Sequence, residues 1–285
     1  MTRIITGLGE VAGAYDALFC DIWGVVHNGH ALFSGVAEAL AAFRDRGGVV
    51  VLVSNAPRPA GSVAPQLDRL GLPRRAWDAI VTSGDVARSH VAAQAGKALF
   101  HLGPERDRPL FEGHDIRFAG EEAAEVIVCT GLFDDTVETP ETYLPMLRRF
   151  LARGVPMICA NPDLVVERGG TMIYCAGAIA DAYETLGGPV VTCGKPHRPI
   201  YDAGFAVVET ALGRRVEPGR VLAIGDSVRT DLAGAAAIGC GALFVTGGIH
   251  ALEAGHGAAL DEAALRTFLA EQGVAPDWAM PHLVW

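Results

Sequence analysis

Short apolar runs rich in Val, Ile and Leu alternate along the chain with Ala-rich segments whose apolar residues recur at helical spacing. One set of runs lies at 17–20, 49–53, 78–81, 190–193, 220–224 and 242–245. The helical segments between them are 34–46, 57–70, 84–94, 199–212 and 229–238. Runs that are apolar throughout, rather than at alternate positions, are typical of strands buried on both faces of a parallel sheet. The pattern therefore predicts an α/β fold with a doubly wound parallel sheet.

The middle of the chain predicts a second, smaller α/β unit. Its expected strands are 97–100, 116–118, 125–128, 156–159 and 171–174, and its expected helices lie near 139–153 and 177–186. We expect this unit to be inserted between two strands of the first sheet, with crossings near residues 82 and 190. The predicted domains are a core of 1–81 with 191–285 and an inserted unit of 82–190.

Composition excludes several classes of protein. Half of the 285 residues are hydrophobic and a fifth are charged, so the chain can bury a globular core. The net charge of −10 opposes binding to nucleic acid, and no apolar run approaches the roughly 20 residues that cross a bilayer. No secretory signal is visible at the N-terminus, and the six cysteines form no C-x-x-C pair. We expect a cytoplasmic protein with reduced cysteines and no nucleic-acid or membrane partner.

Polar residues follow four of the runs that predict strands of the first sheet. In chain order they are Asp21, Ser54 with Asn55, Lys195, and Asp226 with Asp231 five residues later. In open α/β sheets, ligands bind outside the carboxyl ends of the strands. A carboxylate nucleophile, a hydroxyl group, a lysine and further carboxylates are the groups that metal-assisted phosphoryl chemistry requires. We therefore expect these residues to meet in one crevice.

This ordered set resembles the haloacid dehalogenase-like (HAD) hydrolase superfamily. More narrowly, it is similar to the class IIA capped branch, which includes p-nitrophenyl-phosphatase-like and sugar- or nucleotide-phosphatase-like enzymes. The stretch Thr82-Ser83-Gly84-Asp85 resembles the hinge signature of that branch, and Asn161-Pro162-Asp163 resembles its cap-loop signature. The resemblance spans nearly the whole chain. It implies a Rossmann-like core with an inserted α/β cap that closes over the substrate.

The resemblance also implies a role for each site residue. Asp21 would be the nucleophile that forms an aspartyl-phosphate, and Lys195 would offset the negative charge. The residues expected beside the phosphate and the rest of the substrate are Ser54, Asn55, Trp23, Gly24, Asn161 and Asp163. The expected substrate is a small phosphorylated metabolite, such as a sugar phosphate or a nucleotide.

A Mg²⁺ ion is the cofactor that the resemblance implies. Asp21, Asp226 and the backbone carbonyl of Trp23 would bind it, and Asp231 would support the site through water or by orienting its neighbours. Carboxylate and carbonyl oxygens are hard donors that suit Mg²⁺. With no cluster of Cys and His, the sequence does not favour zinc or iron.

The chain departs from the family pattern at Trp23. The usual first motif is D-x-D-G, and its second Asp protonates the leaving alkoxide and then deprotonates the hydrolytic water. An indole has one N–H donor and no useful acidity, so Trp23 cannot exchange a proton at neutral pH. General acid–base assistance is worth roughly 10²–10⁴-fold. Reaction of a substrate with a good leaving group should survive this loss.

Three hypotheses follow from Trp23. The protein is a working phosphatase in which another group moves the proton, and His27 is then the nearest titratable candidate. Alternatively, it binds a phosphorylated metabolite with little or no turnover. Thirdly, metal-free haloacid dehalogenases also carry an aromatic residue at this position, but Asp226 has no use in such an enzyme. The phosphatase is the hypothesis that the sequence favours.

Three remaining segments carry smaller predictions. The G-x-G-x-x-A pattern at 7–12 is expected to be a short N-terminal helix packed on the sheet, because a dinucleotide site needs a longer βαβ crossover. Asp134-Asp135 is expected to be a solvated turn near the cap sheet. Trp278 and Trp285 are expected to dock on their own core, although a homodimer would also bury them.

Overall fold

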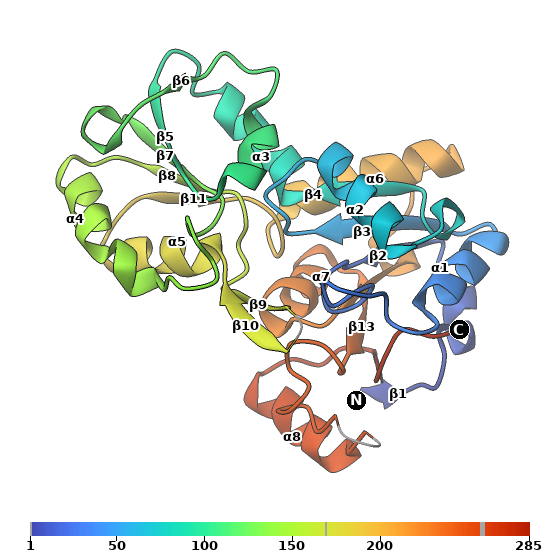
Figure 1. The fold of residues 1–285 in the computed structure, drawn as a ribbon. Coiled ribbons are helices and arrows are strands. Elements are labelled where there is room, and N and C mark those ends of the chain that lie inside the picture. Colours follow the sequence, from blue (N-terminus) through green and yellow to red (C-terminus); the bar gives the residue numbers. More distant parts are fainter. Residues whose placement is uncertain (1, 169, 257–259) are drawn as a thin grey trace.

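The computed structural model describes residues 2–168, 170–256 and 260–285 (Figure 1). A seven-stranded sheet, the core sheet, has the order β1-β14-β13-β12-β2-β3-β4. All its neighbouring strands run parallel. Its strands are β1 (Arg3–Ile4), β2 (Ala17–Cys20), β3 (Val49–Ser54), β4 (Ala79–Thr82), β12 (Val221–Gly225), β13 (Gly241–Val245) and β14 (Trp278–Met280).

Helices cover both faces of the core sheet. Helices α1 (Val36–Asp45) and α2 (Ala60–Leu70) pack on one face, and α6 (Arg198–Leu212), α7 (Ala233–Ile238) and α8 (Glu262–Glu271) pack on the other. Along β2, Leu18 and Cys20 face the first group of helices while Ala17 and Phe19 face the second, and all four are buried. This explains why the run is apolar throughout, and it confirms the doubly wound α/β fold.

A second parallel sheet, the cap sheet, has the order β11-β8-β7-β5-β6. Its strands are β5 (Ala98–Leu102), β6 (Arg117–Phe118), β7 (Val126–Cys129), β8 (Met157–Cys159) and β11 (Val190–Thr192). Helices α4 (Leu144–Ala152) and α5 (Ala176–Thr185) cover one face, and α3 (Ser83–Ala92) with the 3₁₀ helix η4 (Glu105–Phe111) covers the other. Figure 1 shows this green and yellow cap beside the core.

A two-stranded antiparallel hairpin belongs to neither sheet. Its strands are β9 (Val165–Arg168) and β10 (Thr171–Tyr174). In Figure 1 it extends from the cap toward the core. The sequence predicted a strand at 171–174, but it did not predict β9 or the hairpin.

The strand at 190–192 corrects the predicted membership of the core sheet. Val190–Thr192 pairs with Met157–Cys159 in the cap sheet, so the expectation that this run is a core strand is wrong. A short apolar run does not reveal which of two parallel sheets it enters. The division into domains stays a prediction, and this pairing favours a second crossing after Thr192.

The two ends of the chain lie together at one edge of the core sheet. Strand β14 lies between β13 and β1, the Trp278 Nε1–H donates to Tyr15 Oη at 2.8 Å, and the Leu8 N–H donates to the Val284 carbonyl at 2.8 Å. This confirms the predicted docking of the C-terminal aromatic segment on its own core. The segment at 7–12 forms two 3₁₀ turns, Leu8–Glu10 and Ala12–Ala14, rather than one short helix.

Several short helical turns complete the chain. They are η3 (Arg74–Ala76), η5 (Glu121–Ala123), η6 (Pro140–Tyr143), η7 (Pro218–Arg220) and the π turn Val228–Leu232 that leads into α7. Among the helices of the described ranges, none has the length and apolar content to span a bilayer.

Candidate active site

The carboxyl ends of three adjacent core strands, β12, β2 and β3, form the floor of the candidate site. Asp21 directly follows β2, Asp226 directly follows β12, and Ser54 is the last residue of β3. Because the strands are parallel neighbours, these side chains emerge at the same edge of the sheet. All three are buried.

Lys195 ties the acidic residues together. Its Nζ lies 2.7 Å from Asp21 Oδ1 and 2.8 Å from Asp231 Oδ1. The Ile22 N–H also donates to Asp21 Oδ1, at 2.7 Å. One oxygen of Asp21 is therefore held by two donors, which fixes the direction of the other.

The three carboxylates of the cluster fit a divalent cation. Ligand atoms of Asp21, Asp226 and Asp231 all lie within 4.8 Å of one another. Burial raises the pKa of Asp21 well above its usual range despite the opposing effect of Lys195, and burial with the nearby Asp231 raises the pKa of Asp226 to about 7. One ammonium group does not balance three carboxylates, and oxygen-only donors suit Mg²⁺.

Two glycines leave room for the Asp226 carboxylate. A Cβ on Gly24 would lie 2.0 Å from Asp226 Oδ2, and a Cβ on Gly248 would lie 2.1 Å from the same atom. Gly24 also has φ +85°, which favours glycine. The Ile249 N–H donates to that oxygen at 2.8 Å. Gly24 is thus placed against a predicted metal ligand, as well as beside Trp23.

A glycine turn carries the chain from the cap strand β11 to Lys195. Gly194 has φ +99°, and a Cβ there would lie 2.6 Å from Asn55 Oδ1 and 2.8 Å from Ser83 Oγ. Asn55 Oδ1 accepts the Lys195 N–H at 2.8 Å, and Ser83 Oγ–H donates to the Cys193 carbonyl at 2.7 Å. These contacts position Lys195 although its preceding strand belongs to the other sheet.

The stretch that resembles a hinge signature caps a helix. Thr82 Oγ1 accepts the Asp85 N–H at 3.0 Å, and Asp85 Oδ2 accepts the Thr82 N–H at 3.0 Å. This reciprocal pair begins α3. Because Ser83 donates a hydrogen bond to the Cys193 carbonyl, this hydrogen bond links the two segments that join the core and the cap.

Ser54 and Asn55 differ in their freedom to meet a phosphate. Ser54 Oγ accepts the Ala56 N–H at 3.2 Å, which leaves its hydroxyl hydrogen free to donate. The Asn55 amide is already engaged, since its Nδ2 donates to Asp163 Oδ1 at 2.8 Å while its Oδ1 holds Lys195. Phosphate binding by both residues stays a prediction, and the geometry favours Ser54.

The cap loop after β8 reaches the core through Asp163. The Asp163 N–H donates to Asn161 Oδ1 at 3.0 Å, which forms an Asx turn. Asn161 is buried. Burial also raises the pKa of Asp163, and Lys195 opposes this effect.

Trp23 separates two cavities. The first, of about 200 Å³, is lined by Asp21 and Asp226, and the second, of about 110 Å³, is lined by Ser54. Trp23, Asp163 and Val166 line both. The Trp23 Nε1–H donates to the Glu167 carbonyl of β9 at 2.5 Å. The indole therefore docks the hairpin where the family pattern has a second Asp.

The position of His27 does not favour a role in proton transfer. Its side chain is buried, with 1% of the residue exposed, and it lines neither cavity. Its Nδ1 accepts the Gly29 N–H at 2.9 Å, and its ring packs edge-on against Trp23 with centroids 5.0 Å apart. Burial lowers the pKa of His27 to about 4.

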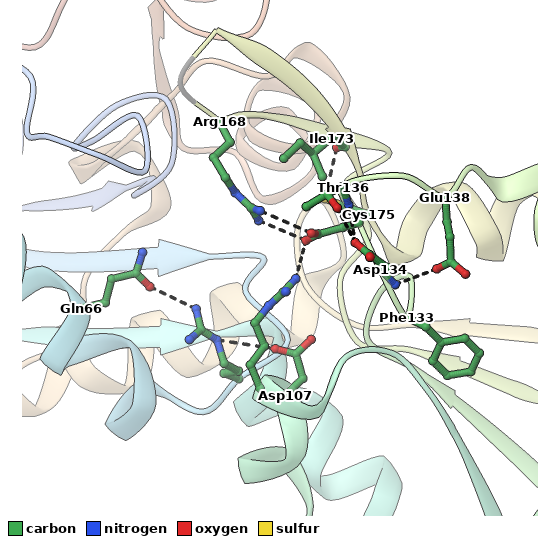
Figure 2. Close-up of polar contacts among 12 residues, drawn as sticks. Gln66, Asp107, Phe133, Asp134, Thr136, Glu138, Arg168, Ile173 and Cys175 are labelled. Atoms are coloured by element: carbon green, nitrogen blue, oxygen red, sulfur yellow. Dashed lines mark hydrogen bonds and ion pairs between the residues drawn. The ribbon is translucent and has the colours of Figure 1, made fainter.

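Sequence reasoning missed the charged groups of the second cavity. They are Arg58, Arg106, Asp107, Asp135 and Arg168, of which Figure 2 labels Asp107 and Arg168. The expectation of a solvated turn is wrong for Asp135, whose side chain is 8% exposed and pairs with Arg106 and Arg168. These residues share no motif and come from segments far apart in the chain, so no sequence pattern marks them.

Comparisons with known proteins identify the family. A family model for haloacid dehalogenase-like hydrolases matches residues 18–117, and a HAD-hydrolase-like model matches residues 192–271. A solved hydrolase of the haloacid dehalogenase-like family from Brucella suis 1330 is 44% identical, covers 99% of this chain and 100% of its own, and superposes with a TM-score of 0.88. The chain belongs to the haloacid dehalogenase-like family.

More distant structures share the fold of this haloacid dehalogenase-like protein. A possible sugar phosphatase from Cytophaga hutchinsonii is 19% identical, with 100% of this chain and 99% of the other covered and a TM-score of 0.81. A p-nitrophenyl phosphatase from Archaeoglobus fulgidus is 21% identical, with 94% and 96% covered and a TM-score of 0.68. No curated protein matches the sequence. The predicted Rossmann-like core with an α/β cap is confirmed.

Proposed function

We propose that this haloacid dehalogenase-like protein is a Mg²⁺-dependent phosphatase of small phosphorylated metabolites, and that it forms an aspartyl-phosphate on Asp21. The observation that carries the proposal is the cluster in which Lys195 bridges Asp21 and Asp231 while Asp226 lies within reach of both. The phosphatases among the structures of the same fold support this assignment. The proposal includes the class IIA branch and a cytoplasmic setting, with which the six free cysteines agree.

In the first step, the free oxygen of Asp21 attacks phosphorus and forms an O–P bond while the ester O–P bond breaks. Lys195 and the Ile22 N–H hold the other carboxylate oxygen, so the nucleophile is oriented before the substrate enters. Ser54 donates to a phosphate oxygen. Mg²⁺, held by Asp21, Asp226 and the Trp23 carbonyl, would offset the charge of the phosphoryl oxygens. Water then hydrolyses the aspartyl-phosphate, which restores Asp21 and releases inorganic phosphate.

We propose that Asp163 is the general acid and supplies the proton that Trp23 cannot supply. It lines the cavity that contains Asp21 and also the neighbouring one, whereas His27 lines neither. Burial raises its pKa, which favours the protonated form that a general acid needs. Its Oδ1 is held by Asn55, so the carboxyl group has a fixed position where the two cavities meet.

The second candidate function is a phosphometabolite-binding protein with little turnover. It is favoured by Trp23, whose only polar group is bonded to the Glu167 carbonyl. A metal-free dehalogenase is disfavoured, since that chemistry leaves the Asp226 carboxylate without a purpose.

Release of phosphate from p-nitrophenyl phosphate and from a panel of metabolites, with Mg²⁺ and with chelator, tests the proposal. We expect Mg²⁺-dependent release that the chelator abolishes. No release from any ester in Mg²⁺, together with tight binding of a phosphorylated metabolite, would establish the binding protein instead.

A further inference from the structure

Three guanidinium groups converge on the second cavity, next to Ser54. Arg58 comes from the core loop between β3 and α2, Arg106 from η4 of the cap, and Arg168 from the end of β9. In Figure 2 the side chain of Arg168 extends toward the region in which Asp107 also lies. We name this space the arginine cavity. It brings cations from both sides of the crevice together in a chain of net charge −10.

The acidic residues beside these arginines accept hydrogen bonds from only a few of the guanidinium N–H groups. Asp135 accepts from Arg106 and from both terminal nitrogens of Arg168. Arg58 Nε lies 3.7 Å from Asp107 Oδ1, which is too long for a hydrogen bond, and Arg58 Nη2 donates to Gln66 Oε1 at 3.1 Å. Each guanidinium has five N–H donors. Within residues 2–168, 170–256 and 260–285, most of these donors have no protein acceptor.

The carboxylates of the cavity differ in how far they oppose an incoming anion. Asp135 pairs with two arginines, which lower its pKa although burial acts to raise it. Burial raises the pKa of Asp107 to about 6 and also raises the pKa of Asp163. Three permanent cations therefore face one firmly ionised carboxylate and two whose ionisation burial disfavours. The unpaired guanidinium donors can therefore bind an added negative group, and Asp107 takes up a proton more readily than an exposed carboxylate does.

The size and the place of the cavity indicate what this group is. A cavity volume of about 110 Å³ has room for several water molecules, and therefore for a carboxylate or a phosphate. The planar fork of Arg matches the oxygens of these two groups. Because Ser54 and Trp23 line the same cavity, the group would belong to the leaving-group part of a phosphate ester.

We propose that the arginine cavity binds a second anionic group of the substrate, a carboxylate or a phosphate, carried on the alcohol part of the phosphate ester. The inference rests on the proposed function and narrows its substrates to esters with two negatively charged ends. A neutral sugar or polyol end leaves the free guanidinium donors of this cavity without a charged partner.

Three esters of equal chain length test the inference. They are propyl phosphate, 3-(phosphonooxy)propanoate and propane-1,3-diyl bisphosphate, and each is used as a competitive inhibitor of p-nitrophenyl phosphate hydrolysis in Mg²⁺. We expect inhibition constants at least tenfold lower for one or both of the doubly charged compounds, since charge-assisted hydrogen bonds are stronger than neutral ones. The carboxylate and the bisphosphate arms show which group the cavity prefers.

Arg106→Gln and Arg58→Gln probe the two sides of the cavity. In Arg106→Gln, Asp135 keeps Arg168 as its partner, so the cap should retain its melting temperature. In each variant the preference for the doubly charged compound should fall about tenfold. Arg106→Lys, which keeps the charge, should recover part of it. Arg117→Gln is the matched control, because Arg117 also pairs with a carboxylate but lies exposed on β6.

Equal inhibition constants for all three esters, or an unchanged preference in folded Arg106→Gln and Arg58→Gln, would overturn the inference. If the wild-type protein releases no p-nitrophenolate, the proposed function fails by itself. Calorimetric dissociation constants for the same three esters then decide the inference. A tenfold preference for a doubly charged ester supports it, and no preference overturns it.

Discussion

The two sides of the Trp23 ring are built in different ways. On one side, Asp21 and Asp226 follow adjacent buried strands of one sheet, and Lys195 locks onto the carboxylates. On the other side, Arg58, Arg106 and Arg168 come from a loop, a 3₁₀ helix and a hairpin. The acidic side is held by backbone pairing in the core, whereas the arginine side is assembled only when core and cap lie together.

Because of this difference, the acidic side is suited to the chemical step and the arginine side to discrimination between substrates. The acidic side holds the groups that the attack on phosphorus requires, with an orientation that the sheet enforces. Neither Asp21 nor Asp226 lines the arginine side, which contains instead the charges that distinguish one leaving group from another. Changes on the acidic side should therefore affect every substrate, and changes on the other side should affect substrates unequally.

The largest effect is expected for Asp21→Asn. An amide cannot replace the carboxylate nucleophile, so turnover of p-nitrophenyl phosphate should fall by at least about a thousandfold. The melting temperature should not fall, because the substitution removes one of three mutually repelling buried carboxylates. Asp202→Asn, at an exposed position on α6, is the control. Retained turnover in Asp21→Asn would show that the nucleophile lies elsewhere.

Asp163→Asn should affect substrates unequally. Ethoxide needs a proton to leave and nitrophenolate does not, so kcat for ethyl phosphate should fall about a hundredfold and that for p-nitrophenyl phosphate much less. The basic limb of the pH–rate profile for ethyl phosphate should disappear in the variant. Glu167→Gln, which alters another carboxylate of the same cavity, should keep the wild-type ratio. Equal losses on both esters would mean that Asp163 only positions Asn55.

Trp23→Asp should raise the rate on alkyl phosphates about tenfold, because it restores a carboxylic acid beside Asp21. It should also lower the melting temperature, since the indole and its bond to the Glu167 carbonyl are lost. Trp23→Phe keeps an aromatic ring without an acid and should show no gain. An unchanged alkyl rate in folded Trp23→Asp would show that this position does not limit proton transfer.

Substitution of His27 should change how the free energy of unfolding depends on pH and should leave turnover nearly unaltered. Its pKa is about 4 in the fold and about 6.5 in an unfolded chain, so the unfolded state binds more protons between these values. The free energy of unfolding should therefore fall as pH drops from about 6.5 toward 4, by about 3 kcal/mol in total. His27→Gln should remove this part of the slope in urea unfolding. An unaltered slope would mean that the imidazole is charged in the fold.

The sequence was sufficient to predict the site residues that lie at the carboxyl end of a buried strand. Asp21, Ser54 and Asp226 end apolar runs, so a sheet edge brings them together, and the structure does so. Lys195 was placed at the site for an incomplete reason, since its strand β11 belongs to the cap sheet and Gly194 turns the chain back.

Other contacts leave no trace in sequence. The partner of Trp23 is a backbone carbonyl, which every residue possesses, so nothing in the residue types reveals the docked hairpin. The arginine cavity depends on residues from three separate segments of the chain, and each alone is typical of an exposed charge. Burial of His27 likewise depends on packing that a turn beside Asn-Gly does not indicate.

Because β1 pairs with β14, this edge of the core sheet can be completed only after β14 has been synthesised. Arg3 pairs with Trp278, and the Ile5 N–H donates to the Ala279 carbonyl at 2.9 Å, so β1 has no partner in the core sheet until β14 has been translated. A nascent chain that stalls before Trp278 exposes the open edge of β13, and such an edge is a template for pairing with another chain. Translation products that lack β14 should therefore aggregate, whereas a chain that includes β14 covers this edge of β13.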